Sequence, residues 1–177
     1  PVVITPEHTV LQVLQLSEEL GISGFPAERG LYETLLGSVG LHAKEEDGNW
    51  RFLTPNQERG ASFKPLWEAT RRLFSDPLVR VGADEIGRLW TAPPFGLRSG
   101  VIPVMFFAFV MAHKGNIALY KDGIFVPRVT DVDVDEYLQS YARFSLRWVT
   151  IDEQKRKILD GISDILHSVG AKSVARD

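Results

Sequence analysis

Residues 99–114 read SGVIPVMFFAFVMAHK, and this pattern predicts a helix that is apolar on every side. From Val104 to Ala112 the apolar side chains run without interruption, so the helix is expected at the centre of the protein. Ser99 is a suitable N-cap, and Pro103 falls near the first turn, where proline is tolerated. A helix packed inside the protein is unavailable for reading bases or performing reactions. If it were left partly uncovered, it would drive the formation of a homodimer.

Two other segments are expected to form β-hairpins, each around an Asp-Gly step. Asp122-Gly123 separates the strand-like residues 116–120 from residues 124–127, and Asp47-Gly48 lies within a similar pattern at 41–53. Glycine supplies the positive φ that tight hairpin turns need.

Apolar side chains at helical or strand spacing predict the remaining elements, and glycine and proline mark their ends. Helices are expected over residues 6–20, 27–40, 62–74 and 83–90, from Thr130 to about 142, and over 151–169. Strands are expected over 78–81 and 144–149. The four tryptophans, Trp50, Trp67, Trp90 and Trp148, are expected to anchor the core, with binding of a partner by one or two of them as the alternative.

These elements predict an α+β fold that is mostly helical and contains two tandem winged-helix-like modules. A winged helix is a helix-turn-helix followed by a β-hairpin wing, and the order of helix and hairpin occurs twice in this chain. The modules are assigned to residues 1–58 and 76–149, with a connecting helix over 59–75 and a C-terminal helix over 150–177.

The composition indicates a globular protein of the cytoplasm. The chain has 177 residues, of which 44% are hydrophobic and 24% charged, so it can bury a core. It has no cysteine, which excludes disulfides and thiolate chemistry and is typical of a reducing compartment. The longest apolar run, residues 101–112, is too short to span a bilayer. Because the first residue is Pro1, either the initiator methionine has been removed or this is a piece of a longer chain, and we expect the second.

No catalytic motif is recognised, and we expect neither enzyme activity nor a cofactor from this chain alone. The four histidines do not share a zinc-binding interval, and there is no Walker A sequence. Asp131, Asp133 and Asp135 resemble the start of a calcium loop, but Glu136 stands where that loop needs glycine. Acidic residues at a helix start are favoured by the helix dipole, and this is the preferred interpretation.

The middle of the chain is basic. Residues 59–128 hold 10 basic and 5 acidic side chains, a net charge of +5, between two acidic ends. This asymmetry indicates either an anionic partner or attraction between blocks within the fold, and the second reading is preferred. For the first, contacts with DNA phosphates would not depend on sequence. The candidate nucleic-acid-binding residues are Arg88, Arg98, Lys114, Lys121 and Arg128. Charge reversal at Lys121 and Arg128 is expected to affect folding little and binding strongly.

Two stretches resemble a segment of large, multidomain bacterial P-loop ATPases, some of them associated with phage defence. They are Leu89-Trp90-x-x-Pro93-Pro94-Phe95-Gly96-Leu97-Arg98-x-Gly100-Val101-Ile102-Pro103 and Asn116-Ile117-Ala118-Leu119-Tyr120-x-Asp122-Gly123-x-Phe125-Val126-Pro127. The resemblance covers roughly residues 26–55 and 85–149. It implies a piece that lies away from the nucleotide site and helps a larger ATP-driven machine to handle nucleic acid or partner subunits.

Two functional hypotheses follow from the sequence. The first is a non-catalytic interaction module of a larger bacterial protein, whose partner is another protein or the rest of the parent chain. The second is a nucleic-acid-binding module that contacts phosphates through its basic middle. Binding to duplex DNA that weakens steeply with salt would favour the second hypothesis.

Overall fold

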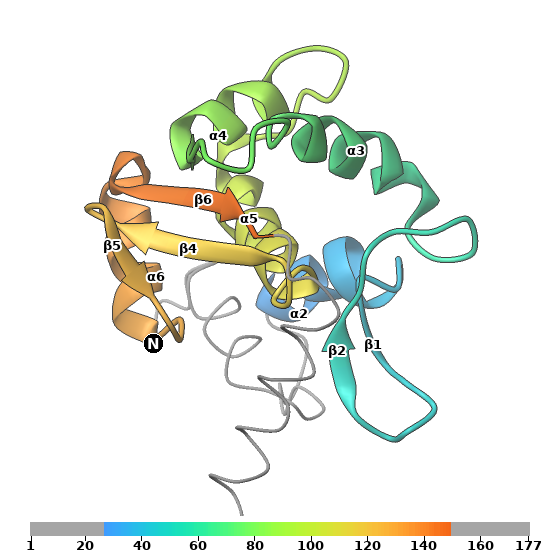
Figure 1. The fold of residues 1–177 in the computed structure, drawn as a ribbon. Coiled ribbons are helices and arrows are strands. Elements are labelled where there is room, and N and C mark those ends of the chain that lie inside the picture. Colours follow the sequence, from blue (N-terminus) through green and yellow to red (C-terminus); the bar gives the residue numbers. More distant parts are fainter. Residues whose placement is uncertain (1–26, 150–177) are drawn as a thin grey trace, which may run out of the picture.

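The computed structural model describes residues 27–149 and shows an α+β fold with two antiparallel sheets (Figure 1). The helices expected over 6–20 and 151–169 lie outside these residues. The α-helices are α2 (Ala27–Tyr32), α3 (Lys64–Arg72), α4 (Ala83–Thr91), α5 (Ile102–Ala112) and α6 (Asp131–Gln139). The strands are β1 (His42–Lys44), β2 (Trp50–Phe52), β3 (Val81–Gly82), β4 (Ile117–Lys121), β5 (Ile124–Val126) and β6 (Phe144–Trp148).

Helix α5 lies in the core, as its apolar sequence predicts. All residues from Val104 to Val110 are buried. Pro103 occupies the first turn, where its missing amide would have no partner in any case. The expectation for Ser99 was wrong: it begins the short 3-10 turn η3 (Ser99–Val101), and Val101 is the N-cap of α5, without a side-chain hydrogen bond. Proline in the first turn and the preceding 3-10 turn start the helix in place of a capping side chain.

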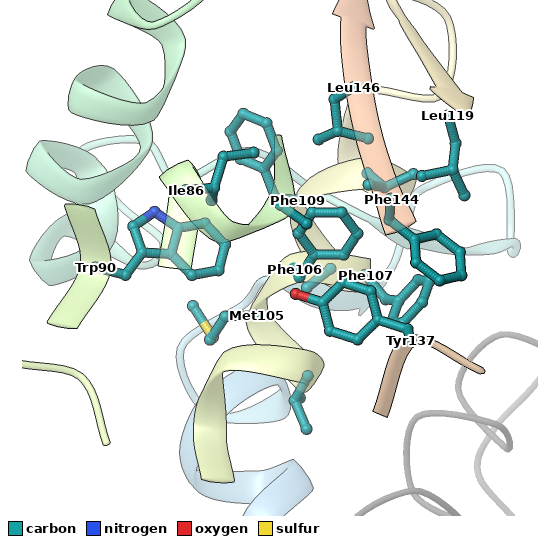
Figure 2. Packing of buried hydrophobic residues seen from close by; sticks show 14 of the residues in the cluster. Ile86, Trp90, Met105, Phe106, Phe107, Phe109, Leu119, Tyr137, Phe144 and Leu146 are labelled. Carbon is teal, nitrogen blue, oxygen red and sulfur yellow. The ribbon is translucent and has the colours of Figure 1, made fainter. Parts of the chain in front are cut away.

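Aromatic side chains from several elements surround α5 (Figure 2). The rings of Phe106 and Tyr137 stack at 4.5 Å between centroids, and Tyr137 also packs against Phe144. On the other side, Trp90 of α4 lies edge-on to Phe109. Burying one such side chain contributes about 1.5–3 kcal/mol. One hydrophobic cluster thereby joins α4, α5, α6 and the sheet.

The tryptophans differ in how deeply they are placed. Trp67 and Trp90 are buried, as expected of core anchors, whereas Trp50 and Trp148 are half-buried. The buried cluster also includes Leu36 of the first expected module and Leu66 of the expected connecting helix.

The larger sheet has the strand order β3-β6-β4-β5 and is antiparallel throughout. Strands β4 and β5 pair with Lys121 opposite Ile124, so Asp122 and Gly123 alone form the turn. Both residues have positive φ, 50° and 80°, which corresponds to the type I′ turn expected of an Asp-Gly step. Figure 1 shows α5 and α6 on the same side of this sheet.

The smaller sheet is the hairpin of β1 and β2. His42 lies opposite Phe52, and residues 45–49 form the loop. Gly48 has the positive φ that was expected there, at 84°. The hairpin packs through β2 against α5.

Several element boundaries differ from the expectation. The helix expected over 27–40 is α2 followed by a π-helical turn, η1 (Glu33–Gly37), and the strand expected over 78–81 is shifted to Val81–Gly82. The helix begun by Thr130 ends at Gln139, and a 3-10 turn, η4 (Tyr141–Arg143), follows it before β6. A 3-10 turn, η2 (Ala61–Phe63), likewise precedes α3. Backbone propensity defines such ends poorly, because terminal turns tighten readily.

Helices followed by a hairpin occur twice in the described residues, as α2 with β1 and β2, and as α4 and α5 with β4 and β5. The sheet of the second group also contains β6, which follows α6 and lies between β3 and β4. Nothing in the sequence predicted this insertion, because residue spacing does not specify which strands become neighbours.

Candidate functional site

One face of the larger sheet is turned away from α5 and presents aromatic and basic side chains. Side chains alternate between the two faces of a strand. Leu119, Phe144 and Leu146 are buried against α5 and α6, so the residues between them stand on the opposite face. The register aligns Tyr120 with Phe125 on one side and with Ser145 on the other. We call this surface the outer sheet face; its residues are Arg80, Tyr120, Phe125, Ser145 and Arg147.

Arg80 lies across the outer sheet face. Its guanidinium carbon is 3.9 Å from the centroid of the Tyr120 ring, and its Nη1 donates a hydrogen bond of 3.1 Å to the carbonyl of Gly123. A guanidinium over an aromatic ring is attracted by the negative ring face. These two contacts hold the side chain of Arg80 against the β4–β5 hairpin.

Phe125 extends this surface toward the edge of the sheet. It is 53% exposed, and its ring centroid lies 5.8 Å from that of Tyr120. At the far side of the face, Arg147 Nε donates a 2.8 Å hydrogen bond to the carbonyl of Pro77.

Two acidic side chains near this face are paired with arginines. Asp84, whose carboxylate lies beside Gly82, pairs with Arg88 at 3.1 Å. Asp122, in the hairpin turn, accepts a 3.0 Å hydrogen bond from Arg143 Nε, and this contact lowers the pKa of Asp122. Arg80 and Arg147 form no ion pair within the described residues, so their charges make the outer sheet face cationic.

The sequence reading missed this surface. Arg80 counted only as part of the basic middle, and Tyr120 and Phe125 only as strand residues. The signal was present, because a two-residue Asp-Gly turn places the two residues beyond its flanking pair, here Tyr120 and Phe125, opposite each other.

Of the candidate nucleic-acid-binding residues, Lys121 is engaged within the fold. It lies on the inner side of the sheet, and its Nζ is 2.7 Å from both Asp133 Oδ1 and Glu136 Oε2. These hydrogen bonds, with Asp133 the larger influence, raise the pKa of Lys121. The expectation that charge reversal at Lys121 affects folding little therefore conflicts with these contacts, because a glutamate there would face two carboxylates.

The other four candidates lie at the surface. Arg88 pairs with Asp84 on α4, while Arg98, Lys114 and Arg128 are exposed and make no ion pair with another residue of 27–149. Lys114 precedes β4 and Arg128 follows β5, so in this antiparallel pair both lie toward the open end of the hairpin. Lys121 lies at the closed end, so the structure does not bring the five candidates together.

His42 and His113 are parts of the packing. His42 shares a 2.9 Å hydrogen bond with the Tyr32 hydroxyl and stacks on Trp50 at 5.2 Å between centroids. Burial lowers the pKa of His42 to about 4. His113 is the C-cap of α5, and its Nδ1 donates a 2.9 Å hydrogen bond to the carbonyl of Phe109. Burial lowers the pKa of His113. His8 and His167 lie outside the described residues.

The acidic run at the start of α6 serves the helix end. Thr130 and Asp133 form a capping box, in which the Thr130 amide and hydroxyl donate to Asp133 Oδ2 at 2.9 and 2.7 Å. Burial raises the pKa of Asp133, but hydrogen bonds from Lys121 and Thr130 outweigh it and lower the pKa. Between residues 27 and 149, no group of three or more possible ligands is placed to hold a metal ion.

Comparison of the chain with protein-family models, with curated proteins and with solved structures finds no match. Among the helices of the described part, none combines the length and the apolar character that a bilayer crossing requires.

Proposed function

We propose that the chain is a non-catalytic interaction module of a larger cytoplasmic bacterial protein, which acts in an ATP-driven machine that handles nucleic acid. Its partner is the rest of the parent chain or another subunit. The proposal also assigns a winged-helix-like role to α4, α5 and the β4–β5 hairpin, in which the hairpin is the wing. The resemblance to bacterial P-loop ATPases supports the machine, and the exposed surface supports the interaction.

The observation that carries this proposal is that exposed apolar side chains precede Arg80 in the chain and also occur on the hairpin that Arg80 contacts. Leu78 is 77% exposed, and Val79 and Phe125 are more than half exposed. Leu78 and Val79 adjoin Arg80 in the chain, and Arg80 contacts the hairpin that carries Phe125. Aromatic residues and arginine surrounded by apolar side chains are the composition of binding hot spots.

The core makes this surface rigid. The buried aromatic side chains of α5 and α6 pack behind β4 and β6, so the hairpin is held from one side while the other side faces outward. A preorganised surface loses less conformational entropy on binding. Since Val104 to Val110 are covered, α5 itself offers little surface for a homodimer; sedimentation of the purified chain tests that remaining possibility.

A titration of the purified chain against the rest of the parent polypeptide, produced separately, tests the proposal by calorimetry. Saturable binding is expected, and Leu78→Ser should weaken it about tenfold or more, as loss of an interface anchor does. The control Glu46→Ala changes an exposed residue in the other hairpin and should bind like the wild type. No heat of binding, or equal weakening by both variants, would contradict the proposal.

A second candidate function is sequence-independent contact with nucleic-acid phosphates. It is favoured by Arg98, Lys114 and Arg128, which are exposed and unpaired within the described residues. Each phosphate contact should add about 0.9 to the slope of log affinity against log salt for duplex DNA. Electrophoretic titration of duplex DNA at about 50 and about 200 mM salt measures this slope. Absence of binding at the lower salt would exclude this function.

A further inference from the structure

We infer that the outer sheet face binds single-stranded nucleic acid, with bases stacked on Phe125 and on the Arg80–Tyr120 pair. The inference rests on the second candidate function and specifies its ligand and its surface. It differs from phosphate contact alone, because here the bases themselves touch protein.

Two planar surfaces stand side by side on this face. The first is the half-exposed ring of Phe125, and the second is the guanidinium of Arg80, which lies exposed over Tyr120. Tyr120 links the two, since its ring is 5.8 Å from Phe125 and 3.9 Å from the guanidinium carbon. Bases stack on aromatic rings and on arginine without regard to sequence, because every base has a π-face.

The charge of the face suits the phosphates that accompany such bases. Arg80 and Arg147 both belong to it, and the bordering carboxylates of Asp84 and Asp122 are paired with Arg88 and Arg143. Beyond the end of β5, Arg128 is exposed and can meet a further phosphate along the strand. A nucleic-acid strand matches these arginines, because it provides a negative charge at each nucleotide.

The geometry favours a single strand over a duplex. In a duplex the base faces are stacked on one another, so Phe125 and Arg80 could not stack on a base. In a single strand the bases can turn outward onto a sheet, as they do on other sheet-based readers of single strands.

Strand β5 supplies a matched pair of variants for the test. Ile124 and Phe125 are neighbours and are 73% and 53% exposed, but their side chains stand on opposite faces of the sheet. Fluorescence anisotropy of a labelled oligothymidylate, titrated with the full chain, measures affinity for a single strand. Phe125→Ala should weaken this affinity about tenfold, Phe125→Trp should preserve it, and Ile124→Ala should leave it unchanged.

A duplex titrated in parallel separates this inference from the function on which it rests. Salt-dependent duplex binding that Phe125→Ala leaves intact, together with weakened binding of the single strand, supports the stacking surface. Equal effects of Phe125→Ala and Ile124→Ala, or duplex binding without any single-strand binding, overturn the inference and leave the phosphate function standing. Binding to neither probe overturns both and leaves the protein-interaction proposal.

Discussion

The indole Nε1 of Trp90 donates a 2.7 Å hydrogen bond to the hydroxyl of Thr70, which donates in turn to the carbonyl of Leu66 at 2.8 Å. Both Trp90 and Thr70 are fully buried. This chain of hydrogen bonds joins α4 to α3 across the core. It also gives the buried indole N–H a hydrogen-bond partner. A buried donor without a partner would lower the free energy of unfolding.

Replacement of Thr70 by valine should therefore destabilise the fold by about 1–3 kcal/mol, since it leaves the Trp90 N–H unpaired at nearly constant volume. Urea unfolding followed by tryptophan fluorescence measures the change. Thr91→Val is the matched control, because the Thr91 hydroxyl bonds the carbonyl of Gly87 on an exposed surface. A similar decrease in unfolding free energy in the two variants would show that the buried hydrogen bond stabilises the fold no more than the exposed one.

The burial of His42 makes stability depend on pH. Its pKa is about 4 in the folded protein, below the ordinary value of 6.5, so the unfolded chain binds the proton more readily. The stabilisation is complete above pH 6.5 and is lost as the pH falls toward 4. The two values imply a loss of about 3 kcal/mol from this group. His42→Phe should remove that part of the slope between these pH values, measured as the wild-type minus variant difference in unfolding free energy. A parallel pair of curves would contradict the assignment.

Local rules predicted what depends on local sequence. The apolar pattern around Phe107 placed α5 in the core, and Asp122-Gly123 predicted the hairpin of β4 and β5, although Lys121 belongs to β4 and not to the turn. The start of the helix at Thr130 was predicted from the sequence, although the capping partner Asp133 was interpreted only as a favourable charge.

What could not be predicted depends on long-range neighbours. Lys121 counted as a free cation because its partners, Asp133 and Glu136, lie on a different element, and only the packing of α6 under the sheet brings them together. In the same way, β6 joins the sheet next to β4, which brings Arg147 onto the face that carries Tyr120. Residue spacing does not predict either of these long-range contacts.

The position of Lys121 leads to a prediction that separates folding from binding. Lys121→Glu would place a carboxylate beside Asp133 and Glu136 and should lower the unfolding midpoint. Arg128→Glu, at an exposed site with no ion pair in the described residues, should leave the midpoint unchanged while it weakens duplex binding. Thermal unfolding by circular dichroism, combined with the duplex titration, tests both. A normal midpoint for Lys121→Glu would mean that the pairing with α6 does not stabilise the fold.

Replacement of two glycines, Gly123 and Gly87, by alanine should change the free energy of unfolding in opposite directions. Gly123 has a φ of 80° in the type I′ turn, where a Cβ costs about 1 kcal/mol or more, so Gly123→Ala should destabilise the protein. Gly87 lies inside α4 with ordinary helical geometry, and an added Cβ would meet no atom within 4 Å. Gly87→Ala should therefore stabilise the protein by about 0.4–1 kcal/mol, since alanine restricts the unfolded chain and favours the helix. Denaturant unfolding of both variants measures whether each substitution raises or lowers the free energy of unfolding. If Gly123→Ala were neutral, the two-residue turn that sets Tyr120 opposite Phe125 would not require its left-handed backbone, and the register of the outer sheet face would have to be held by packing alone.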